Sequence, residues 1–216
     1  MSSARTTGDE SLATILAEDR IAAVLRGREV SDPAALTRAL ATAGIRCVEF
    51  TLTLPDAVEA MAEARGVVDA FVGAGTVTTA AEAERVISAG AQFVVSPGLA
   101  LDVVGPCREA GIPFVLGAYT PSEVMAAVRA GSAVVKLFPA GLGGPRYLRD
   151  LRGPFPEVPL VPSGGVSVDN VAAFLAAGAV AAFAGSDLVP REAVENGELD
   201  GLVARAKRYR AVIAER

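Results

Sequence analysis

The chain has 216 residues, of which 51% are hydrophobic and 21% charged, a composition typical of one soluble globular domain with a large apolar core. Its formal net charge of −5 offers no cationic field to a phosphate backbone, which argues against a nucleic-acid partner. The absence of histidine excludes histidine acid–base relays and histidine metal ligands, and Cys47 and Cys107 have no spacing typical of a disulfide framework or a zinc site.

No segment is expected to enter a membrane or a secretory route. Residues 1–8 are polar and lack the apolar stretch of a signal peptide, so we expect a flexible N-terminal tail there and one domain over residues 9–216. The most apolar window, residues 171–185, is shorter than the roughly 18 residues that a membrane span requires. Together with the cysteine usage, these features predict a cytoplasmic protein without a membrane partner.

Eight short apolar runs alternate with alanine-rich stretches along the chain. The runs are continuous rather than alternating, as expected for parallel strands covered by helices. Helices are expected over residues 10–19, 33–43, 55–64, 80–89, 100–110, 121–130 and 168–177, and the basic run at 205–210 is expected to be the cationic end of a last helix. The expected strands are IAAVLR (21–26), RCVEFT (46–51), AFVGAG (70–75), QFVVSP (92–97), PFVLGA (113–118), AVVKLF (133–138), PLVPSG (159–164) and VAAFAG (180–185).

A repeated Ala-Gly pair marks five of the junctions between these elements. In each case a helical stretch ends and an apolar run begins at once, which predicts a helix that stops at a left-handed glycine before a strand. The pairs end at Gly44, Gly90, Gly111, Gly131 and Gly178. Eight strands in strict alternation with helices favour the α/β class, as a single (β/α)8 TIM barrel with one short extra N-terminal helix.

Lys136 is the most unusual residue of the predicted barrel. It lies inside the apolar run AVVKLF, whereas Lys207, the other lysine, lies among charged residues near the C-terminus. Strand alternation points Lys136 and Phe138 into the barrel. Because burial disfavours an ammonium ion, the pKa of Lys136 should fall and leave a neutral amine that can attack a ketone and form an imine.

Glu49 is the natural proton carrier for such an imine. It shares the inner face of the second strand with Cys47, Thr51 and Thr53, and the second and sixth strands stand opposite each other in an eight-stranded ring. A glutamate there would take a hydroxyl proton and return it. The alternative is a buried Lys136–Glu49 salt bridge that only fixes the barrel, and Cys47 is expected to serve core packing.

Two glycine-containing segments, PSGGV at 162–166 and AGSDL at 184–188, follow the seventh and eighth strands. In barrels, the loops after these strands commonly build a phosphate site from backbone amides and a helix N-terminus. We therefore expect Gly164, Gly165 and Ser186 to bind phosphate. The alternative for the glycine pair is a tight turn.

Four further residues at strand ends are expected to shape the pocket. Thr76 would bind a carboxylate through its hydroxyl, unless it or Thr78 caps the next helix. Pro97 and Phe138 would form an apolar wall around the imine, or else only pack. Arg26 would pair with a substrate carboxylate or phosphate, the alternative being a salt bridge to the buried glutamate.

Six motifs of the chain resemble those of the KDPG/KHG aldolase family, the class I 2-keto-3-deoxy-6-phosphogluconate and 4-hydroxy-2-oxoglutarate aldolases. In order, the motifs are VEFTLTLPDAVEA, VGAGTV, GAQFVVSPGL, VVKLFPA, PSGGV and AGSDL, within residues 21–188. The resemblance implies a pyruvate-forming lyase that acts through a lysine imine, as a homotrimer and without a metal or other cofactor.

The resemblance also implies a role for each motif residue. Lys136 corresponds to the Schiff-base lysine and Glu49 to the general acid/base, and the remaining positions are the carboxylate ligand Thr76, the pocket wall Pro97 and Phe138, and the phosphate site Gly164, Gly165 and Ser186. One position departs from the family, in which the second-strand motif carries arginine, or in some members asparagine, where this chain has Thr53. Threonine lacks the charged, bidentate grip that arginine gives a carboxylate, and Arg26 is a candidate to compensate.

These inferences predict the reversible cleavage of a 2-keto-3-deoxy sugar acid, carrying a 6-phosphate, to pyruvate and an aldehyde such as glyceraldehyde 3-phosphate. One alternative is the same chemistry on an unphosphorylated keto acid such as 4-hydroxy-2-oxoglutarate. The other is a catalytically weak protein that binds a sugar phosphate or a keto acid.

Overall fold

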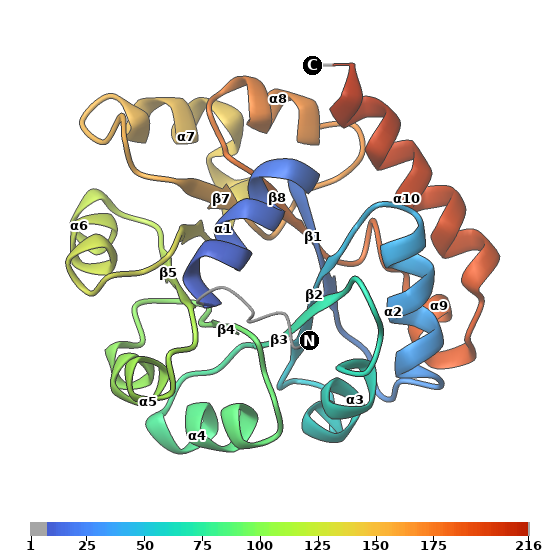
Figure 1. Ribbon diagram of the computed structural model, residues 1–216. Helices are drawn as coiled ribbons and strands as arrows, with labels where there is room; N and C mark the ends of the chain where they lie inside the picture. The colour runs from blue at the N-terminus through green and yellow to red at the C-terminus, as the bar shows by residue number, and fades with distance from the viewer. Residues whose placement is uncertain (1–7, 216) are drawn as a thin grey trace, which may run out of the picture.

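The computed structural model describes residues 8–215 as eight parallel strands surrounded by helices (Figure 1). Each strand lies within one of the eight predicted runs, so the predicted strand set is confirmed. The strands are β1 (Ile21–Leu25), β2 (Cys47–Thr51), β3 (Phe71–Gly75), β4 (Val94–Val95), β5 (Phe114–Ala118), β6 (Val135–Leu137), β7 (Leu160–Pro162) and β8 (Ala182–Ala184).

The strands form a barrel because the sheet returns to its starting edge. Neighbours pair in parallel in the order β7-β6-β5-β4-β3-β2-β1-β8. A parallel bridge between Ser163 and Phe183 joins the two outer strands, and the N–H of Val180 donates to the carbonyl of Leu160 at 3.1 Å. The predicted (β/α)8 TIM barrel is confirmed.

Helices follow the strands around the outside of the barrel (Figure 1). The expected helix over 100–110 is a short 3₁₀ turn, η1 (Leu101–Val103), followed by α5, and a second such turn is η2 (Ala140–Leu142). The α-helices are α1 (Gly8–Asp19), α2 (Pro33–Thr42), α3 (Ala57–Ala64), α4 (Ala80–Ser88), α5 (Val104–Ala110), α6 (Pro121–Arg129), α7 (Gly144–Arg152), α8 (Val171–Ala176), α9 (Arg191–Asn196) and α10 (Leu199–Ala214).

The extra helix α1 closes the amino-terminal end of the barrel. Leu12 and Leu16 are buried in one cluster with interior residues such as Cys47 and Phe71, which begin their strands. The predicted tail over residues 1–8 lies outside the described residues except for Gly8, which belongs to α1. The barrel therefore has its open end at the carboxyl ends of the strands.

The five predicted Ala-Gly junctions all adopt the expected geometry. Their glycines have positive φ angles between 66° and 103°. Such angles are readily available only to glycine, which reverses the chain from helix to strand in few residues. The junctions set the alternation of helix and strand that places all eight strand ends on one side.

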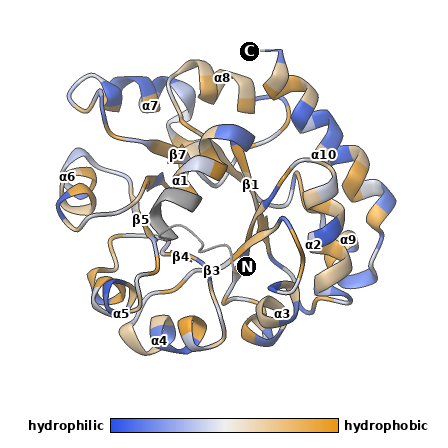
Figure 2. Cartoon of the chain, in the orientation of Figure 1, coloured by the Kyte–Doolittle hydropathy of each residue, from blue (hydrophilic) through white to orange (hydrophobic). Residues whose placement is uncertain are grey.

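Apolar side chains form two layers, one between strands and helices and one inside the barrel. Val48 and Phe50 of β2 face the helices, whereas Cys47 faces the interior, as strand alternation predicts. Figure 2 shows the matching pattern on the helices, where hydrophobic and hydrophilic residues alternate along α10. No helix among residues 8–215 is long and apolar enough to cross a membrane.

The interpretation of the basic run at 205–210 as a helix end is wrong. The helix α10 continues to Ala214, so these residues lie in its middle. The apolar spacing of Tyr209 and Ile213, both buried, carries the helix one turn further. Arg205 and Arg210 instead donate hydrogen bonds to the carbonyl oxygens of Asp187 and Asp19.

Candidate active site

Lys136 and Glu49 meet inside the barrel. They lie in the middle of β6 and β2, on the inner face of each strand, and their side chains are 2% and 0% exposed. The Nζ of Lys136 is 3.6 Å from Oε2 of Glu49. The predicted approach of these two residues across the barrel is confirmed.

The Glu49 carboxylate is buried without hydrogen-bonding support. Within residues 8–215, neither of its oxygens accepts a hydrogen bond. A structural ion pair needs additional hydrogen bonds to offset the cost of desolvating both charges. The contact to Lys136 is also longer than a hydrogen bond, so this geometry favours a pair that shares a reacting molecule.

The third strand makes room for this carboxylate. A Cβ added at Gly75 would collide with the Glu49 side chain, and one added at Gly73 would collide with Phe93. Gly75 is the last residue of β3, beside Thr51 of β2. The two glycines of the GAG sequence in β3 are therefore required by the volume of the neighbouring residues.

Burial lowers the pKa of Lys136. The nearby Glu49 carboxylate opposes this shift, and the positive charge of Arg26 adds to it. The rings of Phe138 and Phe183 have their centroids 5.7 Å from Nζ and exclude solvent around it. Lys136 therefore presents an amine with an increased neutral fraction, which is the form that adds to a carbonyl carbon.

Thr53 is tied to a hydroxyl chain at the end of β2. The Thr51 hydroxyl donates to the carbonyl of Leu25 at 2.9 Å and lies 2.7 Å from the Thr53 hydroxyl. Because the Thr51 hydroxyl already donates its only hydrogen to Leu25, the Thr53 hydroxyl is the donor in the bond between the two threonines. Thr53 is exposed at the mouth of the barrel and retains only acceptor capacity.

Thr76 follows β3 with a φ angle of 61°, unusual for a β-branched residue. The cap of α4 is Thr79, whose hydroxyl accepts from the N–H of Glu82, while Thr78 donates to the Glu82 carboxylate. The capping alternative for Thr76 is therefore wrong. The strained backbone instead holds Thr76, half-buried, at the end of the strand that adjoins Glu49.

A pocket of about 310 Å³ lies between the ends of β1, β7 and β8. Within residues 8–215, the N–H groups of Gly164, Gly165 and Ser186 donate no backbone hydrogen bond. The alternative of a salt bridge between Arg26 and Glu49 is wrong, because Glu49 is paired with Lys136. Arg26 is exposed and lines this pocket. The polar and glycine residues that line it include Arg26, Ser163, Gly164, Gly165, Ser186 and Asp187.

Phe138 connects the lysine with this pocket. A Cβ added at Gly164 would lie 2.9 Å from the Phe138 ring, whose centroid is also 5.7 Å from Nζ of Lys136. Pro97 lies against β5, where a Cβ at Gly117 would collide with its backbone. The structure thus brings the two predicted wall residues to the carboxyl ends of β4 and β6.

Sequence reasoning missed three residues beside these groups. Phe183 covers Lys136, and its inward position follows from alternation along VAAFAG. Gly75 borders Glu49, which only the register of β2 with β3 reveals. Asp187 lines the 310 Å³ pocket, although an acidic residue is not expected beside a phosphate.

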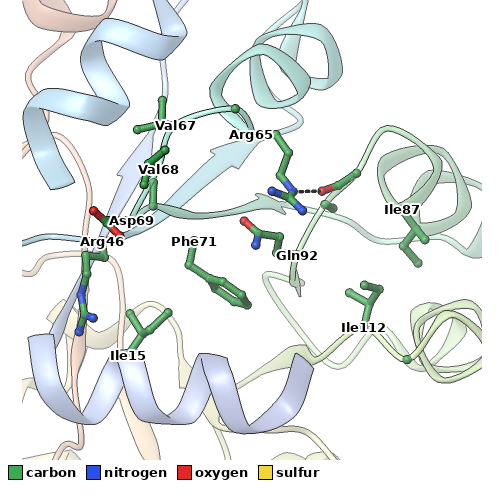
Figure 3. Close-up of a pocket in the computed structure, with 15 residues that line it drawn as sticks. Ile15, Arg46, Arg65, Val67, Val68, Asp69, Phe71, Ile87, Gln92 and Ile112 are labelled. Carbon is green, nitrogen blue, oxygen red and sulfur yellow. Dashed lines mark hydrogen bonds between the residues drawn. The ribbon is translucent and has the colours of Figure 1, made fainter. Parts of the chain in front are cut away.

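A larger cavity, of about 820 Å³, lies at the opposite end of the molecule (Figure 3). It is lined by residues that precede or begin strands, such as Phe71 and Gln92, together with Ile15 of α1. Its Arg65 donates to the backbone carbonyl of Gly90 at 3.0 Å, and the side-chain Oε1 of Gln92 accepts from the N–H of Val72. Since barrel enzymes place their chemistry at the carboxyl ends of the strands, this cavity is not the candidate active site.

The fold and the buried pair define a class of protein, a (β/α)8-barrel enzyme with an amine and a carboxylate facing each other inside the barrel. The family model for KDPG and KHG aldolase matches residues 12–205. The chain belongs to the KDPG and KHG aldolase family. It is a carbon–carbon lyase of the aldehyde-lyase class.

Individual relatives match over most of their length. The 2-dehydro-3-deoxy-phosphogluconate aldolase of Dickeya dadantii is 40% identical over 80% of this chain and 82% of its own. The KHG/KDPG aldolase of Escherichia coli strain K12 is 36% identical over 91% of this chain and 93% of its own. The solved KDPG aldolase of Legionella pneumophila, with pyruvate captured as a covalent carbinolamine, superposes with a TM-score of 0.82 at 30% identity, covering 90% of this chain and 96% of that one.

Proposed function

We propose that this chain is a class I aldolase that cleaves a 2-keto-3-deoxy sugar acid through an imine on Lys136. The observation that carries the proposal is the Lys136 amine, 2% exposed and 3.6 Å from an otherwise unpartnered Glu49 carboxylate within the described residues. The names of the relatives and the carbinolamine of the Legionella protein support the same chemistry.

The proposed reaction begins when the neutral amine of Lys136 adds to the C2 ketone. The oxygen is protonated and leaves as water, and a protonated imine remains. Glu49 takes the proton of the C4 hydroxyl, the C3–C4 bond breaks, and its electron pair forms an enamine while the aldehyde leaves. Protonation of the enamine at C3 and hydrolysis release pyruvate and restore the amine. The imine is the electron sink, so the proposed mechanism needs no metal or other cofactor.

The pocket residues would bind the two ends of the substrate. Thr76 would donate to the keto-acid carboxylate, with Pro97 and Phe138 as the apolar wall beside the imine. Arg26 and the free amides of Gly164, Gly165 and Ser186 would hold a phosphate. Thr53 lines the mouth and, having no hydrogen to donate, offers an acceptor to a substrate hydroxyl.

The phosphorylated substrate is favoured by the 310 Å³ pocket, which is lined by one arginine and by three residues whose N–H groups donate no backbone hydrogen bond within residues 8–215. The products would be pyruvate and glyceraldehyde 3-phosphate or a similar aldehyde. The second candidate substrate is 4-hydroxy-2-oxoglutarate, supported by the name of the Escherichia coli relative. We further propose that residues 9–216 act as one domain, that the protein is cytoplasmic, and that it assembles as a homotrimer, as the family resemblance implies.

Borohydride reduction in the presence of pyruvate tests the imine. Native protein and Lys136→Ala are reduced, and intact mass and peptide mapping locate the adduct. The proposal expects one pyruvate-derived adduct on the peptide containing Lys136, in the native protein alone. An adduct on Lys207, or binding of pyruvate without any adduct or turnover, would leave a keto-acid binding protein as the better description. Comparing KM for the phosphorylated and unphosphorylated substrates then distinguishes the two candidate substrates.

A further inference from the structure

Asp187 is an acidic residue in a pocket that the proposed function assigns to an anion. Its Oδ2 accepts two hydrogen bonds, from the N–H of Val168 at 3.0 Å and from the hydroxyl of Tyr209 at 2.7 Å. Its backbone carbonyl accepts a third, from Arg205 at 2.9 Å. These bonds hold the Asp187 carboxylate toward α8 and α10, where its charge is compensated by donors.

Tyr209 donates its hydrogen bond to this carboxylate from a buried position. It lies on α10, is 1% exposed, and packs in the layer between strands and helices. Burial and the bond to Asp187 raise the pKa of Tyr209, so its phenol remains a hydrogen donor. A buried hydroxyl that reaches a residue 22 positions earlier fixes the loop after β8 against the C-terminal helix.

Val168 connects Asp187 with the loop after β7. In that loop, the Asn170 side chain donates to the carbonyl of Gly165 at 2.8 Å and accepts from the N–H of Ser167 at 2.9 Å. The segment from Gly165 to Asn170 is thereby held as one unit. Asp187 joins this unit to the loop that carries Ser186.

The two loops belong to different strands, and their separation determines whether their amides converge on one phosphate. A single oxygen of Asp187 spans that separation, with Tyr209 as its anchor on α10. We propose that Asp187 and Tyr209 are positioning residues. They hold the loops after β7 and β8 at the separation at which the N–H groups of Gly165 and Ser186 bind one terminal phosphomonoester. This inference rests on the proposed phosphate-binding function.

The test compares phosphorylated and unphosphorylated substrates on full-length variants. Tyr209→Phe removes one hydroxyl, Asp187→Ala removes the acceptor, and Asp187→Asn retains an oxygen acceptor without the charge. For Tyr209→Phe we expect KM for 2-keto-3-deoxy-6-phosphogluconate to rise roughly three- to tenfold, the loss expected for one hydrogen bond. Asp187→Ala should raise it at least as much, and Asp187→Asn should recover most of the native value.

Two readouts separate positioning from general damage. The kcat/KM for 4-hydroxy-2-oxoglutarate and the rate of borohydride trapping with pyruvate should remain native, whereas inorganic phosphate should inhibit 4-hydroxy-2-oxoglutarate cleavage more weakly in Tyr209→Phe and Asp187→Ala. Tyr147→Phe is the matched control, because it loses a hydroxyl bonded at 2.6 Å to the carbonyl of Tyr119, and neither tyrosine lines this pocket. It should leave the inhibition by phosphate unchanged.

An equal change for both substrates, or no change for either, overturns the inference. If Tyr209→Phe does not fold, as judged by circular dichroism, the comparison of Asp187→Ala with Asp187→Asn tests the inference. Asp187 is only half-buried, so its substitution is expected to leave the fold intact. A native enzyme that neither prefers the phosphorylated substrate nor is inhibited by phosphate overturns the phosphate site itself. A native enzyme that does both, with unaffected variants, overturns only the positioning roles.

Discussion

Gly75 of β3 and Glu49 of β2 are in contact so closely that a Cβ on the glycine would occupy the position of the carboxylate. The space beside Gly73, the other glycine of this strand, is filled by Phe93. The position of the proposed proton carrier is therefore fixed by a residue that carries no functional group.

Gly75→Ala should displace the carboxylate and reduce kcat by roughly tenfold or more, as expected when a general acid–base group is misplaced. Pyruvate trapping on Lys136 should fall less, because the amine itself is not displaced. The matched control is Gly105→Ala in α5, where an added Cβ meets no atom within 4 Å. Native kcat in Gly75→Ala would show that the Glu49 carboxylate need not occupy this position.

Glu49→Gln keeps the size of the side chain and removes its proton-transfer capacity. We expect kcat to fall by about 10²- to 10⁴-fold, while borohydride still traps pyruvate on Lys136. Because the Glu49 carboxylate raises the pKa of Lys136, its loss should shift the pH dependence of trapping to lower pH. Steady-state rates and trapping rates across a pH series measure both effects. A shift to higher pH would contradict the assigned interaction.

The lowered pKa of Lys136 also predicts the sign of a stability change. Between the folded-state pKa and the ordinary value of 10.5, the unfolded chain binds more protons than the folded one, so the free energy of unfolding rises with pH. Below this window both states are protonated, and the full cost of burying the charge destabilises the fold. In a Glu49→Gln background, which leaves no unpaired buried carboxylate, Lys136→Met should be more stable than its parent at neutral pH, and the difference should shrink toward pH 10.5. Urea unfolding at several pH values tests this, and a difference that grows with pH would refute it.

Thr76 and Thr53 form a matched pair for carboxylate binding. Thr76 is proposed to donate its hydroxyl hydrogen to the carboxylate, whereas Thr53 donates its own to Thr51. Thr76→Val should weaken pyruvate binding by roughly five- to tenfold, the loss of one hydrogen bond to a charged group. Thr53→Val should weaken it by less than about twofold, because the Thr53 hydroxyl has no hydrogen free to donate to the carboxylate. The dependence of trapping rate on pyruvate concentration gives both values. The reverse order would show that Thr53, rather than Thr76, binds the carboxylate.

The fold was predictable because local signals agreed with each other. The eight apolar runs, and the glycines ending at Gly44, Gly90, Gly111, Gly131 and Gly178, specify alternation without knowledge of any long-range contact. The predicted end of α10 was wrong because a run of basic residues looks the same in the sequence whether it lies at the end of a helix or in its middle. Only the burial of Tyr209 and Ile213 distinguishes the two cases.

The site was predictable where strand alternation fixes a side chain, and not where packing does. Lys136 and Glu49 point inward because of their positions in β6 and β2, and the ring places these strands opposite each other. The contact between Asp187 and Tyr209 depends on how α10 crosses the barrel, which no local pattern encodes. The contact of Gly75 with Glu49 likewise depends on strand register.

The closure of the amino-terminal end of the barrel by α1 predicts the order in which ligands bind and leave. Leu12 and Leu16 block one end of the barrel, so ligands enter and leave by the same route past the exposed Ser186 and Gly165. Lys136, at 2% exposure, lies deeper than either residue. With one end of the barrel closed, we expect the aldehyde to depart first and the keto acid held by the lysine to depart last, and in synthesis we expect pyruvate to enter first. Pyruvate should therefore compete with the substrate for the free enzyme, whereas the aldehyde should not.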